Sequence, residues 1–233
     1  MFLGHFGVAL AVKRLEPKIS LGSLFMAVQL ADLLWGCFVL LGWEHARIIP
    51  GYTVVTPLQF YDYPLSHSLL AAVGWALVAA AMYYSWPTRD TSRHWQAAAL
   101  VGLAVLSHYL LDVLVHAPDL PISGNDSGKL GFGLWNNLGA TLALELLVFG
   151  AGLAIYVAFR SHRHPVRPIR LALLVVVLLV SYFANLRGPL PPSMTVVAAS
   201  SIGFFVLVAI LAGWADQRAT PDELAAAGLD SRK

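Results

Sequence analysis

The sequence has few charged residues. Only 12% of its 233 residues are Asp, Glu, Lys or Arg, while 58% are hydrophobic. A soluble domain carries about 25% charged and roughly 45–50% apolar residues. The mean hydropathy of +0.69 points the same way. This shortage of charge excludes an ordinary soluble domain and indicates an integral membrane protein.

Cysteine and excess basic charge are scarce as well. Cys37 is the single cysteine, so the chain cannot form an internal disulfide. The net charge is only +2, and basic loops facing lipid headgroups account for it. We therefore expect membrane lipid, and no nucleic acid, among its partners.

Motifs for nucleophilic catalysis are also missing. The chain has no Gly-x-Ser-x-Gly sequence and no Cys-His pair. The segment 124–130 has too few residues between its glycines for a phosphate-binding loop, and Leu130 stands where Ser or Thr must bind magnesium. Covalent catalysis by the protein is not supported.

Long apolar stretches recur along nearly the whole chain. Crossing a hydrocarbon core takes about 20 helical residues. The sequence therefore predicts an all-α fold, a polytopic transmembrane bundle of about six spanning helices. The apolar segment 2–12 is too short to cross unaided, and we expect a short re-entrant or packed helix there. The six expected spans are residues 19–42, 66–86, 95–117, 136–159, 169–187 and 194–214.

Basic residues predict the orientation of this bundle. Most of them lie in the loops 13–18, 87–94 and 160–170, whereas the loops 43–65 and 118–135 hold only one each. Short cytoplasmic loops are enriched in Lys and Arg. We therefore expect the C-terminal tail in the cytoplasm and the two weakly charged loops outside.

The run from Ser107 to His116 places three possible metal ligands on one helix. His108, Asp112 and His116 are spaced four residues apart, so they share one face. Imidazole and carboxylate groups at this spacing can chelate a cation. A charged side chain near the centre of a spanning helix costs about 2.5–3.5 kcal/mol, so these groups need a partner or a polar cavity.

Ionisable residues of other spans lie at matching depth. Asp32 and His108 each lie roughly 20 Å from the cytoplasmic end of their spans. His67 opens the second span from the outer side, and Glu145 lies about 14 Å into the fourth span from that side. The sequence therefore predicts that these groups converge in the outer half of the bundle.

Simpler roles remain open for each of these residues. His5 can be a hydrogen-bonded structural residue, and His67 can lie at an interface beside a capping Ser66. His108 and Asp112 can form a pair within their helix. His116 and Asp119 can be solvated polar residues near the outer surface. Glu145 can form a hydrogen bond within its own helix or to a neighbouring helix.

Four sequence features together resemble a known family. They are Gly4-His5-Phe6, Asp32, Pro64-Leu65-Ser66-His67-Ser68 and Ser107-His108-x-x-Leu111-Asp112. Over residues 1 to about 150 the chain resembles the YdjM-type, LexA-regulated membrane-bound metal-dependent hydrolases. The resemblance implies a metal site formed by His5, Asp32, His67, His108 and Asp112.

The chain departs from the family pattern at two positions. Asp62 stands where the family usually has a further histidine, and the usual pair of aspartates in the first helix is reduced to Asp32. The resemblance therefore does not extend to a second metal. The fifth and sixth spans hold almost no ionisable residue. We therefore expect a helical bundle at 1–160 that holds the site, two accessory packing helices of the same domain at 161–214 and a cytoplasmic tail at 215–233, in a bacterial inner (plasma) membrane.

Histidine with carboxylate suits zinc best, and manganese or iron less selectively. We expect a hydrolase in which Asp112, His116 or Glu145 acts as general base or orients a ligand histidine. A site near the outer leaflet makes a lipid or lipid-linked ester the expected substrate. The alternatives are a transporter or relay for protons or metal ions, and a structural membrane protein with a metal clip.

Overall fold

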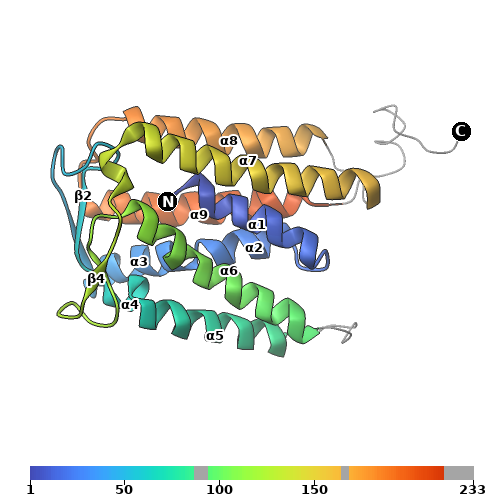
Figure 1. Cartoon of the computed structure of the whole chain (residues 1–233), viewed down its shortest axis with the longest axis horizontal. Helices are drawn as coiled ribbons and strands as arrows, with labels where there is room; N and C mark the ends of the chain where they lie inside the picture. Colours follow the sequence, from blue (N-terminus) through green and yellow to red (C-terminus); the bar gives the residue numbers. More distant parts are fainter. Residues whose placement is uncertain (87–93, 164–167, 218–233) are drawn as a thin grey trace, which may run out of the picture.

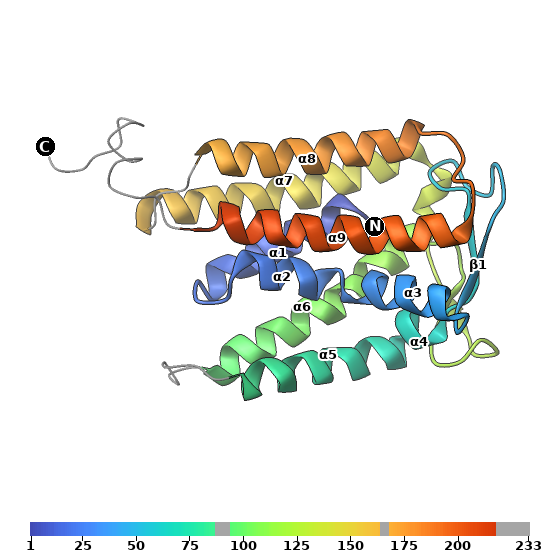
Figure 2. The same ribbon diagram turned by 180° about the vertical axis from the view of Figure 1, so that it is seen from behind.

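The computed structural model describes residues 1–86, 94–163 and 168–217, without the side chains of 159–163. Within these ranges the chain forms nine α-helices and two small hairpins, which confirms the predicted all-α bundle (Figures 1 and 2). The helices are α1 (Leu3–Leu15), α2 (Leu21–Val28), α3 (Leu30–Leu41), α4 (Pro64–His67), α5 (Leu69–Ser85), α6 (His94–Val115), α7 (Leu138–Arg163), α8 (Pro168–Arg187) and α9 (Met194–Ala215).

Four helices are each long and apolar enough to cross a membrane: α6, α7, α8 and α9. The expected span 19–42 is not one straight helix, because α2 and α3 meet at an angle of 56°. The expected span 66–86 is divided into α4 and the 17-residue α5. The Ser68 side chain accepts a hydrogen bond from the Ala71 amide, so Ser68 rather than Ser66 caps α5.

The N-terminal apolar segment forms α1, which packs inside the bundle against α7, as Figure 1 shows. Two glycines allow the close approach. A Cβ on Gly7 would lie 2.5 Å from the Val148 carbonyl oxygen, and a Cβ on Gly152 would collide with the Gly7 backbone. Small residues at a helix crossing permit such backbone contact. This contact fixes the position of His5 in the core.

The weakly charged loops gather at one end of the bundle (Figure 1). Here β1 (His45–Ile48) pairs antiparallel with β2 (Leu58–Asp62), and β3 (Leu120–Pro121) with β4 (Lys129–Leu130). A short 3₁₀ turn, η1 (Leu134–Asn136), precedes α7. The C-terminal ends of α5, α7 and α9 lie at the opposite end of the bundle. Successive long helices therefore run in opposite directions, as the charge pattern predicts.

A buried ion pair joins helices at that opposite end. Lys13 of α1 pairs with Asp216, with 2.5 Å between Nζ and Oδ2, and the Tyr156 hydroxyl donates to the same carboxylate at 3.0 Å. This contact connects α1, α7 and the end of α9. Of the predicted tail at 215–233, residues 218–233 lie outside the described part of the chain.

Candidate metal centre

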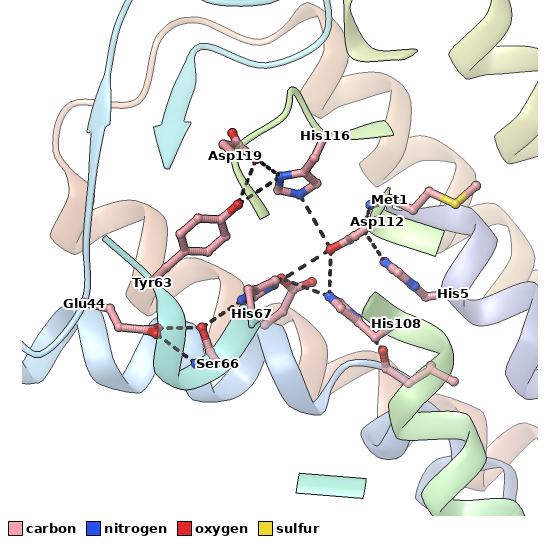
Figure 3. Close-up of polar contacts among 12 residues, drawn as sticks. Met1, His5, Glu44, Tyr63, Ser66, His67, His108, Asp112, His116 and Asp119 are labelled. Carbon is pink, nitrogen blue, oxygen red and sulfur yellow. Dashed lines mark hydrogen bonds and ion pairs between the residues drawn. The ribbon is translucent and has the colours of Figure 1, made fainter. Parts of the chain in front are cut away.

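Asp112, in the last turn of α6, is the centre of a buried polar cluster (Figure 3). Its Oδ2 lies 3.1 Å from Nε2 of His108, 3.6 Å from Nε2 of His116 and 3.8 Å from Nε2 of His67. Asp32 of α3 is the second carboxylate. Its Oδ1 lies 3.4 Å from Nε2 of His67 and 3.8 Å from Nε2 of His108. The structure thus brings together predicted ligands from three different spans.

The break between α2 and α3 orients His108. At the break, the Val28 carbonyl oxygen accepts a hydrogen bond from Nδ1 of His108 at 2.7 Å. A carbonyl oxygen can only accept, so Nδ1 must carry the proton and the Nε2 of a neutral ring carries the lone pair. The bend in the helix therefore helps to direct the His108 lone pair toward Asp112.

A serine and a glutamate orient His67 in a similar way. The Ser66 hydroxyl donates its proton to Glu44 at 2.5 Å, and the Ser66 amide donates to the same carboxylate at 2.8 Å. Since that hydroxyl has only one proton, Nδ1 of His67 must donate to the serine oxygen, at 2.8 Å. The lone pair of His67 is therefore also on Nε2, which faces the cluster.

His116 follows α6 directly and has its own carboxylate partner. Its Nδ1 lies 3.1 Å from Oδ1 of Asp119, which also accepts a hydrogen bond from the Tyr63 hydroxyl at 2.8 Å. Nδ1 is again the donor, so Nε2 of neutral His116 presents a lone pair to Asp112. Partners that fix a ligand histidine through its second nitrogen are typical of metal sites.

The three rings thus direct acceptor atoms at a carboxylate, which is itself an acceptor. With all three rings neutral this arrangement is repulsive, and three imidazolium ions would place excess positive charge in an apolar bundle. A proton on one Nε2 makes a single contact attractive, such as the 3.1 Å contact of His108, and leaves the other two lone pairs facing the carboxylate. A cation between the acceptors removes the repulsion. Nitrogen and oxygen ligands of a tetrahedral zinc ion lie about 3.3–3.4 Å apart, given bonds of about 2.0–2.1 Å. The observed separations of 3.1–3.8 Å scatter around this value.

His5 of α1 completes the cluster on the other side of Asp112. Its ring stacks on that of His108 with 3.9 Å between centroids, and its Nε2 lies 3.2 Å from Oδ1 of Asp112. Oδ1 also accepts a hydrogen bond from the amino group of Met1. Two groups of ligand atoms each lie within 4.8 Å of one another: His5, His108 and Asp112, and Asp32, His67 and His108. These buried groups can hold a metal ion.

Glu145 and Asp62 have other partners. The two carboxylate oxygens of Glu145 accept hydrogen bonds from the amides of Phe2 and Gly4, each at 2.7 Å, at the start of α1. A carboxylate at a helix N-terminus is favourable. Asp62 lies on β2, where it accepts hydrogen bonds from His45 and Asn125 at 2.7 and 2.5 Å.

Sequence reasoning did not find Glu44 and Tyr63 as partners of the site, and it left Asp119 open. Glu44 and Tyr63 lie in or beside irregular loops, so helical spacing gave no signal for them. Burial raises the pKa of Glu44, although Ser66 donates hydrogen bonds to it. Burial and the neighbouring Asp119 raise the pKa of Tyr63 well above its usual value, so Tyr63 remains a hydrogen-bond donor at neutral pH.

A cavity of about 640 Å³ lies beside the cluster. Its walls include parts of α8 and α9, the loop between β1 and β2, Trp35 and Trp135. Asp32 belongs to both the cavity and the cluster, and its side chain is 24% exposed against 3% for Asp112. The helices α8 and α9, predicted as accessory helices, thus also line the cavity beside the cluster.

Comparison of the chain with protein-family models, curated proteins and solved structures finds no match. The geometry of the cluster is therefore the main indication of function.

Proposed function

We propose that this chain is an integral-membrane metal-dependent hydrolase of the YdjM type. The observation that carries the proposal is the convergence of histidine lone pairs on Asp112. The donors Asp32, His67, His108 and Asp112 would hold the cation, and His5 packs against this set. Two nitrogen and two carboxylate donors suit zinc best among the divalent ions.

With three of these donors on the cation, a fourth position would stay open for water. The cation would lower the pKa of that water toward about 7 and polarise the bond to be cleaved. His116 is suited to be the general base, because Asp119 holds its Nδ1 proton and its Nε2 faces the cluster. His116 would take a proton from water as the water oxygen adds to the carbonyl or phosphoryl centre. It would then return the proton to the leaving alcohol as the ester bond breaks.

The alternative function, a transporter or relay, needs polar groups that continue across the bundle. The stretch of α6 from residue 95 to 106 contains no ionisable residue. At the far end of the described bundle, the Lys13 ammonium and the Asp216 carboxylate already pair with each other. This one-sided distribution favours a hydrolytic site over a pathway.

Metal analysis of the detergent-purified protein tests the proposal. We expect the wild type, purified without chelators, to hold stoichiometric metal, and His108→Ala and Asp32→Asn to lose most of it. His94→Ala is the matched control, because His94 is partly exposed, lies at the opposite end of α6 from the cluster and donates a hydrogen bond to the Tyr84 carbonyl oxygen there. A metal-free wild type, or equal metal in all four proteins, would contradict the proposed site.

A second measurement covers variants that fold poorly. Zinc added back to chelator-stripped wild type should raise its thermal unfolding midpoint, with a much smaller rise for Asp32→Asn. Hydrolysis of a chromogenic acyl ester should depend on the added metal and fall at least about 100-fold in His116→Ala. Metal binding without any ester hydrolysis would favour the relay or structural functions.

A further inference from the structure

The cavity beside the cluster has features of a binding site for an amphiphile. Its volume of about 640 Å³ lies within the range of roughly 300–1,000 Å³ found for small-molecule pockets. Apolar side chains of α8, α9 and the β1–β2 loop line most of it, including Leu186, Val196, Val197 and Phe205. Asp32 and Glu145 lie on its wall next to the metal cluster.

Two buried hydrogen-bond donors on this cavity lack a partner. The indole Nε1 of Trp35 and the hydroxyl of Tyr182 make no hydrogen bond within the described chain, although these residues are only 4% and 3% exposed. Leaving a buried polar group unpaired costs about 1–3 kcal/mol. Both residues line the cavity, although the two donor atoms themselves are covered by protein. A ligand with acceptor oxygens would be their partner once either side chain turned toward the cavity.

Resting on the proposed hydrolase function, we infer that this cavity binds a membrane-derived lipid ester. The acyl chain lies along the apolar wall of α8 and α9, and Trp35 and Tyr182 donate hydrogen bonds to the ester oxygens. Asp32 lines the cavity and also faces His67 and His108. An ester bound in the cavity near Asp32 therefore lies next to the candidate metal site. The substrate class is therefore an ester with a long acyl chain rather than a small soluble ester.

Photocrosslinking tests this inference without requiring turnover or metal. The probe is a monoacylglycerol whose acyl chain carries a diazirine, incorporated into detergent-solubilised wild-type protein. We expect crosslinks at α8 and α9 residues that line the cavity, mapped by mass spectrometry to 182–190 and 196–205. Crosslinks confined to exposed lipid-facing residues such as Leu207 and Ile210 would overturn the inference.

Variants on α9 supply a matched comparison. Ser201→Trp fills the cavity and should reduce cavity crosslinking by at least about fivefold. Ile210→Trp, on the same helix but 64% exposed, should leave it unchanged. Equal crosslinking in both variants would contradict a cavity-bound chain.

Tyr182→Phe tests recognition of the ester itself. This change removes the hydroxyl and keeps the ring that stacks on Phe2 at 5.7 Å. Binding of the ester probe should fall about three- to tenfold, as expected for one lost hydrogen bond. Binding of the ether analogue, which lacks the carbonyl, should change much less, and an equal loss for both probes would overturn the assigned hydrogen bond.

The outcomes separate this inference from the hydrolase proposal. Cavity crosslinking in a protein that holds no metal would support the lipid site and refute the hydrolase. Stoichiometric metal with crosslinks only on the lipid face would refute the lipid site and leave the metal centre in place.

Discussion

Three of the four histidines around Asp112 each have a different outer partner at the Nδ1 atom, and His5 is the exception among the described residues. His108 uses the Val28 carbonyl, His67 uses Ser66, and His116 uses Asp119. The outer partners determine which nitrogen is free, and so they determine whether the cluster can bind a cation at all. Residues that never touch the metal should therefore affect its affinity.

Ser66→Ala is the direct test of this dependence. The change removes the hydroxyl that accepts the His67 Nδ1 proton and should weaken zinc affinity about 10- to 100-fold, as measured by competition with a chromophoric chelator. Ser66→Thr keeps the hydroxyl and should restore most of the affinity.

Ser68→Ala is the control for Ser66→Ala. It removes the cap of α5 and should cost about 1 kcal/mol of stability while leaving zinc affinity nearly unchanged. Similar zinc affinities in Ser66→Ala and Ser68→Ala would show that the outer partner of His67 does not matter.

At the scale of elements, the contact between α1 and α7 positions His5. Gly152→Ala places a methyl group against the Gly7 backbone, which cannot move without shifting α1. We expect a loss of about 1–3 kcal/mol in the free energy of unfolding, together with reduced metal retention. Gly150→Ala is the control, because its added Cβ meets no atom within 4 Å.

Gly150→Ala should therefore be neutral or stabilising by up to about 1 kcal/mol. Denaturant titration in detergent and metal analysis of both variants check the prediction. Equal stability of the two variants would contradict the role of this helix crossing.

The β1–β2 hairpin is tied to the loop that follows α6 by Asp62. Although partial burial opposes it, hydrogen bonds from Asn125 and His45 hold the pKa of Asp62 below its usual value. An acid with a lowered folded-state pKa stabilises the fold above its unfolded-state pKa of about 3.9 and loses this contribution as the pH falls through the folded value.

Wild type should therefore unfold at a higher temperature than Asp62→Asn at pH 6, and this difference should shrink steadily below about pH 4. Using the difference between the two proteins cancels effects of acid on the His/Asp cluster that both share. A difference that stays constant from pH 6 to pH 3 would contradict a charged Asp62 in the folded state.

For the whole molecule, sequence patterns predicted the helical bundle but not its bends. Apolar runs long enough to span a membrane identify α6 to α9 directly. The break at Gln29 has no proline or glycine to announce it, and the freed Val28 carbonyl is a backbone group that no sequence motif displays. Tertiary packing decides that break.

For the polar cluster, too, the sequence predicted some contacts and not others. The four-residue spacing on α6 and the matching depths of Asp32 and His108 predicted their meeting, because helical geometry converts spacing into position. Glu44 and Tyr63 reach the cluster through irregular loop conformations, and Glu145 turns to the α1 backbone. Helical periodicity carries no information about such contacts.

The charge asymmetry of the bundle predicts its orientation in the membrane. The weakly charged loops 43–65 and 118–135 lie at the end that holds the cluster, and the positive-inside rule predicts that this end faces away from the cytoplasm. The cluster would then work on the outer side, within reach of outer-leaflet lipids.

Single cysteines at the two ends test this orientation. In a Cys37→Ser background, Ser123→Cys lies in the loop between β3 and β4, and Ser85→Cys lies at the far end of α5; both positions are exposed. A membrane-impermeant maleimide added to intact cells should label Ser123→Cys and not Ser85→Cys, whereas both should react after permeabilisation. The reverse pattern would place the cluster on the cytoplasmic side, because the two positions lie at opposite ends of one continuous bundle.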